Sequence, residues 1–135
     1  MYNPRFPHKL SLLRPRTGVS GDIIFDRYGN VVYDVVPLTV VTMLDGDPCR
    51  NADGSFVTTT ANFVNCGYRT ETGNVKVWGD VVVADMKIDS QMFLNPLFFG
   101  DILEITDYEQ TYRVSVVKKV TFNWGTSIWT DNIQN

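Results

Sequence analysis

Few side chains in this sequence are of the types that enzymes use for catalysis. His8 is the only histidine, and Pro4, Pro7 and Pro15 break up the segment around it. No carboxylate or nucleophile lies beside it in the sequence, and such a segment is a poor frame for a general acid or base. The chain also lacks the glycine-rich phosphate-binding motifs and the serine-nucleophile motif. The sequence therefore predicts a protein that is not an enzyme.

The carboxylates of residues 45–55 (DGDPCRNADGS) could in principle bind calcium, because oxygen ligands recur at short intervals. A calcium loop that begins at Asp45 would need an oxygen ligand in place of Cys49, glycine in place of Arg50 and glutamate in place of Phe56. The pattern fails at all three positions. We interpret these residues as a solvated, projecting loop and expect no metal or other cofactor.

Cys49 and Cys66 are the only cysteines. Without a second histidine they match no known zinc spacing. No apolar run reaches the roughly 18 residues of a membrane-spanning helix, and the N-terminus lacks the apolar core of a signal peptide. We therefore expect a cytoplasmic origin without membrane contact, in which free thiols are favoured over a disulfide.

Aromatic and basic residues near the C-terminus could bind single-stranded nucleic acid. Tyr112 and Phe122 would stack on bases, with Lys118 and Lys119 beside them, as on the face of a small β-barrel. However, both aromatic residues are in phase with apolar valines, and residues 21–135 hold 8 basic against 15 acidic side chains. Packing in a core is the better interpretation.

The stretch from Gly100 to Phe122 has the clearest structural pattern. Its second half alternates, with Tyr112, Val114, Val116, Val120 and Phe122 on one face and Arg113, Ser115, Lys119 and Thr121 on the other. Only Val117 and Lys118 interrupt this period of two, which is typical of a strand with one buried face. With a short strand over residues 102–106 and a polar turn at residues 107–110, the stretch predicts a β-hairpin.

Many further short strands are expected between turn signals, over residues 9–13, 22–26, 31–36, 38–44, 56–60, 63–69, 75–85 and 127–133. Residues 86–96 fit either extended chain or one helical turn capped by Ser90. No amphipathic helix of ten residues is present. The sequence thus predicts an all-β fold, a small antiparallel β-barrel or sandwich with an extended N-terminal arm and a long projecting loop. We expect residues 1–20 to form the arm and residues 21–135 a single barrel domain.

The predicted arm is basic. Residues 1–20 contain Arg5, Lys9, Arg14 and Arg16 and no acid, although the whole chain has a net charge of −3. This asymmetry suggests two different neighbours for arm and body, or a ring in which each arm reaches the acidic body of the next copy, and a solvated tail is the alternative.

The hairpin and the N-terminal segment together resemble a known family. Residues 100–105 (GDILEI) and 112–117 (YRVSVV), with residues 7–14 (PHKLSLLR) and 26–32 (DRYGNVV), are similar to the head-closure or head–tail joining proteins of tailed bacteriophages. The resemblance implies a structural protein of the virion neck, made in the host cytoplasm. It would form a homo-oligomeric ring of about twelve copies. That ring would contact portal, adaptor and tail proteins, and genomic DNA would pass through it without sequence-specific binding.

On this hypothesis three groups of residues are candidate interfaces. The arm contributes Arg5, Phe6, His8, Lys9, Arg14 and Arg16, the projecting loop Asp45, Asp47, Arg50 and Asp53, and the polar face of the hairpin Arg113, Ser115 and Lys119. The alternative function is a β-barrel or sandwich that binds carbohydrate or single-stranded nucleic acid on a platform of Trp78, Trp124 and Trp129.

Overall fold

The computed structural model describes residues 6–71, 74–77 and 79–133, and within these ranges the chain forms strands, turns and irregular segments but no helix. The strands are β1 (His8–Pro15), β2 (Tyr33–Val36), β3 (Leu38–Val41), β4 (Met43–Leu44), β5 (Asp47–Pro48), β6 (Thr58–Ala61), β7 (Val64–Thr70), β8 (Asn74–Val77), β9 (Asp80–Val83), β10 (Met86–Ser90), β11 (Ile102–Asp107), β12 (Gln110–Phe122) and β13 (Gly125–Asn132). The predicted all-β class is confirmed.

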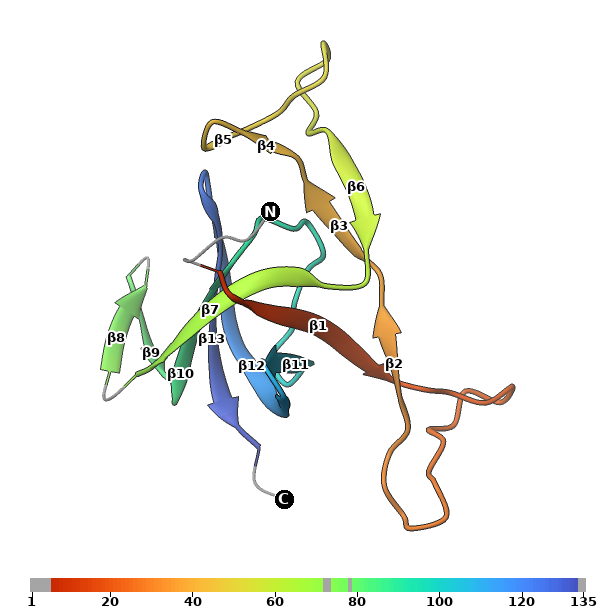
Figure 1. Cartoon of the computed structure of the whole chain (residues 1–135). Helices are drawn as coiled ribbons and strands as arrows, with labels where there is room; N and C mark the ends of the chain where they lie inside the picture. The colour runs from red at the N-terminus through yellow and green to blue at the C-terminus, as the bar shows by residue number, and fades with distance from the viewer. Residues whose placement is uncertain (1–5, 72–73, 78, 134–135) are drawn as a thin grey trace.

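Six antiparallel strands close into a barrel (Figure 1). Their order is β11-β12-β13-β10-β7-β1, and β1 returns to β11 with Lys9 opposite Thr106 and Leu13 opposite Ile102. This last pairing leaves the wall without an open side. Closure satisfies the backbone groups that an open sheet would expose at its edges.

The barrel interior is filled by the alternate residues of its strands. Each strand contributes apolar side chains that are at most 1% exposed: Leu10, Leu12, Val64, Cys66, Ile88, Leu103, Ile105, Val114, Val116 and Ile128. Because neighbouring residues of a strand point to opposite faces, this set follows from the period of two in the sequence. The predicted core face of the hairpin is confirmed for Val114 and Val116.

A β-bulge in β12 reverses the predicted faces beyond Val116. The register with β13 shifts between Val116 and Lys118, so Lys119 lies opposite Ile128, a residue of the barrel interior. One extra residue exchanges the two faces of the strand that follows it. The prediction that Lys119 lies on the outer polar face is therefore wrong, and Val120 packs outside the barrel instead of in its core.

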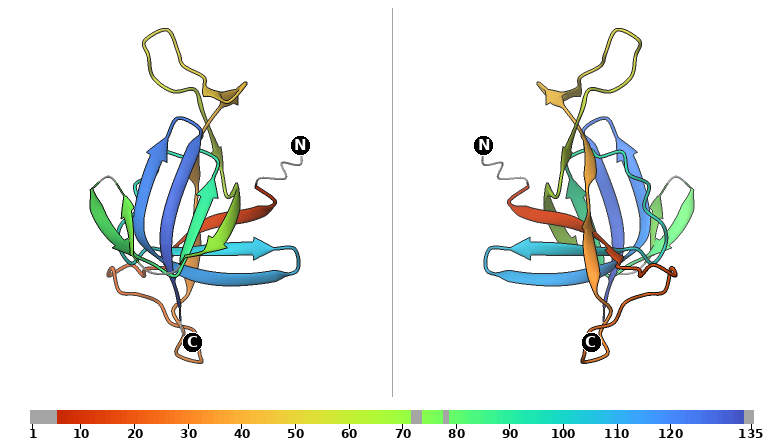
Figure 2. Two further views of the ribbon diagram at one scale, coloured as in Figure 1. Left: turned by 90° about the vertical axis from the view of Figure 1, so that its left-hand side faces the viewer. Right: turned by 90° about the vertical axis from the view of Figure 1, so that its right-hand side faces the viewer.

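The long projection, residues 37–63, is inserted between two strands that pair with the same edge of β1. Along one edge of β1, residues 8–10 pair with β7 and residues 12–15 pair with β2, while β11 occupies the other edge. β2 and β7 thus follow one another along the same edge. The chain between them, residues 37–63, leaves the wall opposite Ser11 as the hairpin of β3 and β6, with β4 and β5 nearer its tip (Figures 1 and 2).

The boundary between arm and barrel needs correction. Residues 8–15 of the predicted arm are strand β1, which pairs with three other strands and buries Leu10 and Leu12 in the core. The proline spacing suggested an independent arm, but the eight residues from His8 to Pro15 are enough for a full strand. Of the remaining arm residues, Arg5 lies outside the described residues.

Two other segments differ from the expected strands. Residues 22–31 form a loop held by the isolated bridges Thr17–Ile23 and Phe25–Val31, and not by two paired strands. Residues 86–90 are strand β10 in the barrel wall, and residues 91–96 form no helical turn, so the alternative of a helical turn capped by Ser90 is wrong.

Deleting residues 2–15 should unfold the protein, because the barrel would lose β1 and leave β7 and β11 with open edges. We expect loss of the cooperative thermal transition, measured by circular dichroism and calorimetry. Replacing residues 45–55 with Asn-Gly is the matched control, since that loop lies away from the core and its loss should leave the transition within a few degrees. A deletion variant that melts like the intact chain would contradict the assignment of β1 to the barrel.

Candidate functional site

The root of the projecting hairpin is fixed to the barrel. Leu38 and Val41 on β3 are buried, and residues 92–94 lie along the other edge of that strand. The backbone N–H of Val41 donates to the carbonyl of Met92, and the N–H of Leu94 donates to the carbonyl of Thr39. The donor and acceptor atoms are 2.9 Å apart in both hydrogen bonds. The base of the hairpin is therefore fixed in its orientation relative to the barrel.

A chain of polar contacts reinforces this root. The ammonium group of Lys119 donates to the carbonyls of Asn95 (2.6 Å) and Phe93 (3.3 Å). The side chain of Asn95 accepts from the N–H of Thr39 (2.7 Å) and donates to the carbonyl of Pro37 (3.1 Å). Burial lowers the pKa of Lys119. Lys119 thus links β12 to the hairpin and is not a free interface residue.

The tip of the hairpin is a structured loop. The guanidinium of Arg50 donates to the carbonyl of Gly54 (2.8 Å) and lies over the ring of Phe56. The carboxylate of Asp53 accepts from the N–H and the hydroxyl of Ser55, and these bonds lower the pKa of Asp53. Arg50 and Asp53 therefore shape the loop internally, while Leu44 below it is 67% exposed.

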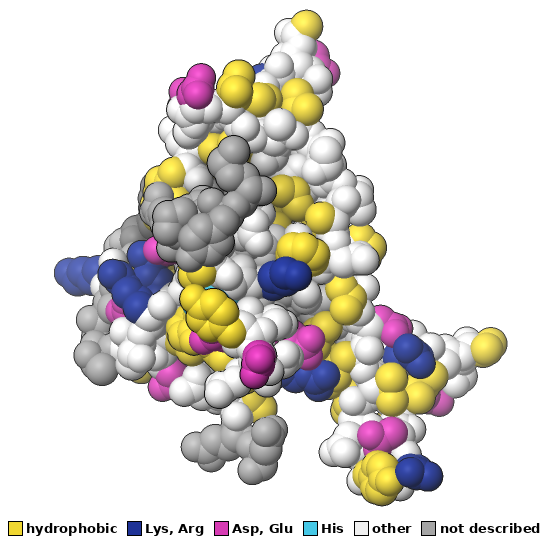
Figure 3. Space-filling model, in the orientation of Figure 1, with side chains coloured by type: hydrophobic (Ala, Val, Ile, Leu, Met, Phe, Trp, Pro, Cys, Tyr) yellow, Lys and Arg dark blue, Asp and Glu magenta, His cyan; other side chains and the backbone are white. Residues whose placement is uncertain are grey.

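A second projection also exposes apolar side chains. It is the loop of residues 16–32, on which Val19, Ile23, Phe25 and Tyr28 are exposed. Figure 3 shows hydrophobic side chains on both the upper and the lower right projections of the molecule. Contiguous exposed apolar surface commonly marks a contact with another protein.

The predicted interface residues of β1 and β12 are mostly engaged within the chain. Arg14 lies 3.7 Å from Asp101, Arg16 lies 2.7 Å from Asp34, and Arg113 lies 3.1 Å from Glu104 and over the ring of Tyr33. Lys9 lies over the ring of Phe63, Phe6 is buried, Ser115 is half-buried on the wall, and Asp45 and Asp47 belong to the hairpin tip. The structure does not bring the three predicted groups together into one surface.

One end of the barrel interior is closed by a polar cluster that the sequence did not reveal. The Nδ1 atom of His8 lies 3.2 Å from the carboxylate of Asp107, and the hydroxyl of Tyr68 donates to the same carboxylate. Tyr112 packs edge-on against Tyr68, and burial raises the pKa of Tyr112. His8 and Tyr112 lie about a hundred positions apart in the sequence, and the pairing of β1 with β11 brings the two ends of the chain together at this cluster.

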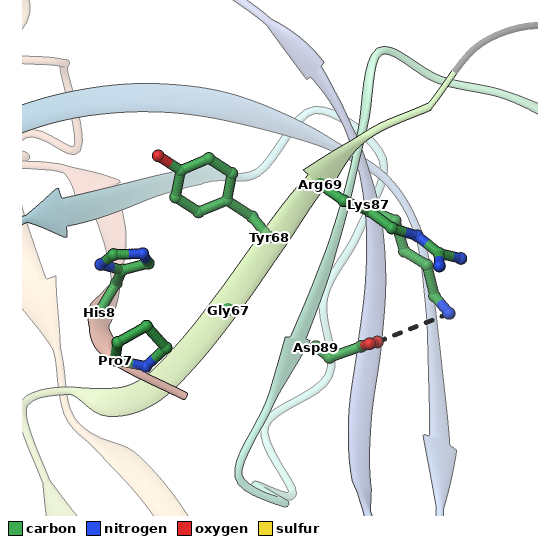
Figure 4. Close-up of a pocket in the computed structure, with 7 residues that line it drawn as sticks. All are labelled: Pro7, His8, Gly67, Tyr68, Arg69, Lys87 and Asp89. Carbon is green, nitrogen blue, oxygen red and sulfur yellow. Dashed lines mark ion pairs between the residues drawn. The ribbon is translucent and has the colours of Figure 1, made fainter. Parts of the chain in front are cut away.

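A pocket of about 280 Å³ lies beside this cluster (Figure 4). Its lining includes His8, Tyr68 and, on the outer wall, Arg69, Lys87 and Asp89. Each cation has an acidic partner, because Arg69 pairs with Glu71 and Lys87 with Asp89. The pocket therefore has no excess of positive charge for an anionic ligand. In the described ranges no three His, Cys, Asp or Glu side chains are placed to share a metal ion.

The predicted tryptophan platform is not formed by Trp129. That side chain is 5% exposed and packs outside the barrel against Val77, Val82 and Ala84 of the β8–β9 hairpin and its exit. Trp124 stacks on Phe122, with ring centroids 5.5 Å apart. Trp78 lies outside the described residues.

No family model, curated protein or solved structure matches this chain. No described segment forms a helix long and apolar enough to cross a membrane.

Replacing Lys119 with Met should loosen the hairpin root, because two carbonyls would lose a charged donor. We expect a loss of about 2 kcal/mol in the free energy of unfolding, measured by chemical denaturation. Lys118→Met is the control. Its ammonium pairs with the exposed Asp80, and such surface pairs contribute at most about 1 kcal/mol. Equal losses in the two variants would contradict an anchoring role for Lys119.

The two thiols should differ in reactivity. Burial, with the nearby Asp107, raises the pKa of Cys66 to about 12, so this thiol is protonated at pH 8. Iodoacetamide at pH 8 should therefore label Cys49 alone in the native chain and both cysteines in urea. Peptide mass spectrometry would detect the labels. Rapid native labelling of Cys66 would show that the barrel opens on the timescale of the reaction.

Proposed function

We propose that this protein is a structural subunit of a bacteriophage neck, forming a ring between portal and tail that helps to close the DNA-filled head and to dock the tail. The observation that carries the proposal is the pair of projections, which expose Val19, Phe25, Tyr28 and Leu44 away from the barrel. Apolar side chains exposed on projections of this kind are suited to contact with partner surfaces.

The anchored root of the hairpin supports the same proposal. The base of the hairpin is fixed, because β3 bonds to residues 92–94 and Lys119 bonds to Asn95. Such a projection is pre-organised for contact, so binding would cost little conformational entropy. Ring subunits need surfaces of this kind, because each copy must contact the next at a constant angle.

Three of the four segments that carry the sequence resemblance lie side by side in the barrel wall. Residues 100–105 and 112–117, which resemble the head-closure family, fall largely in the adjacent strands β11 and β12. Residues 7–14 cover most of β1, which pairs with β11. The fourth segment, residues 26–32, lies in the loop of residues 16–32.

Co-expression with the portal and adaptor proteins encoded in the same genome would test the proposal. Electron microscopy should show an added ring of density below the portal, absent when the chain is omitted. A variant with residues 45–55 replaced by Asn-Gly should fold but join the portal and adaptor assembly less well, because it lacks the hairpin tip. A chain that stays a 15.3 kDa monomer beside assembled portal and adaptor would refute the proposal.

A further inference from the structure

The outer edge of β6 has backbone groups without a strand partner among the described residues. On β3, the N–H of Val41 and the carbonyl of Thr39 bond to residues 92–94, which lie away from β6. In an antiparallel ladder, the residues opposite these two must likewise point away from β3. Those residues are Thr60 and Thr58. Their N–H and carbonyl groups therefore face outward in the plane of the ribbon.

The β6 edge also lacks the features that usually block strand addition. Its four residues, Thr58–Ala61, contain no charge and no proline, and the three threonines are exposed and β-branched. Natural edge strands are commonly protected by lysine, proline or a covering segment. Because the hairpin carries β6 away from the barrel (Figure 1), another chain could approach this edge without meeting the barrel wall.

A second open strand edge lies on β2. The N–H of Arg16 donates to the carbonyl of Val32, which fixes the alternation of the β1–β2 ladder. Residues 34 and 36 then bond to β1, while Tyr33 and Val35 direct their backbone groups away from it. Within the described ranges, β2 pairs with no strand other than β1. The chain thus carries two distinct edges, each with outward backbone groups at two alternate residues.

We propose that the β6 edge of one copy pairs with the β2 edge of the next copy, and that this strand addition joins neighbouring subunits. The inference rests on the proposed ring. A contact between two different edges is head-to-tail, so it leaves one edge of each kind free at the ends and closes only when a ring is complete. Main-chain hydrogen bonds would supply the binding energy, as in other cases of strand addition.

Two proline variants test this pairing. Thr60→Pro removes an outward N–H from β6, and Val35→Pro removes one from β2, and neither N–H belongs to a ladder within the chain. Both variants should therefore fold, since proline is tolerated on an open strand edge. Thr60→Ser and Val35→Thr keep the N–H and are the matched controls. In the portal assembly each proline variant alone should add no ring, while both controls should add one.

Mixing the two proline variants gives the sharper result. The mixture retains one intact β2 edge, on the Thr60→Pro chain, and one intact β6 edge, on the Val35→Pro chain. At a concentration at which the wild-type chain oligomerises, mass photometry should show pairs of about twice 15.3 kDa and no larger species. If a proline variant fails to fold, the double substitution Thr58→Lys and Thr60→Lys blocks the β6 edge instead, because charged lysines on an edge strand disfavour strand addition.

The possible failures are distinguishable. Rings formed by the proline variants as readily as by the wild type would overturn the edge pairing and leave the proposed ring intact. Self-association of Val35→Pro alone would indicate that two β6 edges pair with each other, which also overturns it. Absence of rings from the wild-type chain itself would refute the proposed function.

Discussion

Pairing between β1 and β11 is the interaction on which the rest of the structure depends. It joins the first described strand to the C-terminal hairpin and converts a sheet with two edges into a closed wall. The same closure collects His8, Tyr68, Asp107 and Tyr112 at one end of the interior and seals Cys66 beneath them. Because β1 also holds β2 and β7 on its other edge, it fixes where the insertion of residues 37–63 leaves the barrel.

The insertion gives the chain surfaces that a plain barrel lacks. A closed wall has no free strand edges, so the available edges belong to segments that extend from it, among them β2 and β6. Lys119 and Asn95 tie the base of the hairpin to β12, so the edge of β6 is presented in a constant direction. In the proposed ring, this rigidity would set the angle between neighbouring copies.

Much of the fold could be predicted from local pattern, and what could not depends on contacts distant in sequence. The period of two over residues 112–116 identified core residues such as Val114, because alternation alone decides which side of a strand is buried. The faces of Lys119 and Val120 depended on a bulge whose only signal was the interrupted alternation at Val117 and Lys118. The pairing of His8 with Asp107 has no local signal, since barrel closure alone brings the two together. The prolines suggested an arm because proline spacing reports where a helix is impossible and says little about strand pairing.

Quantifying the chain in purified virions tests the central claim most directly. Virions produced from the genome that encodes this chain would be digested, and peptides such as those spanning residues 110–122 would be measured against peptides of the portal protein. A neck ring matched to the portal predicts about one copy of the chain for each portal subunit. Absence of the chain from virions that contain portal and tail proteins would contradict the account.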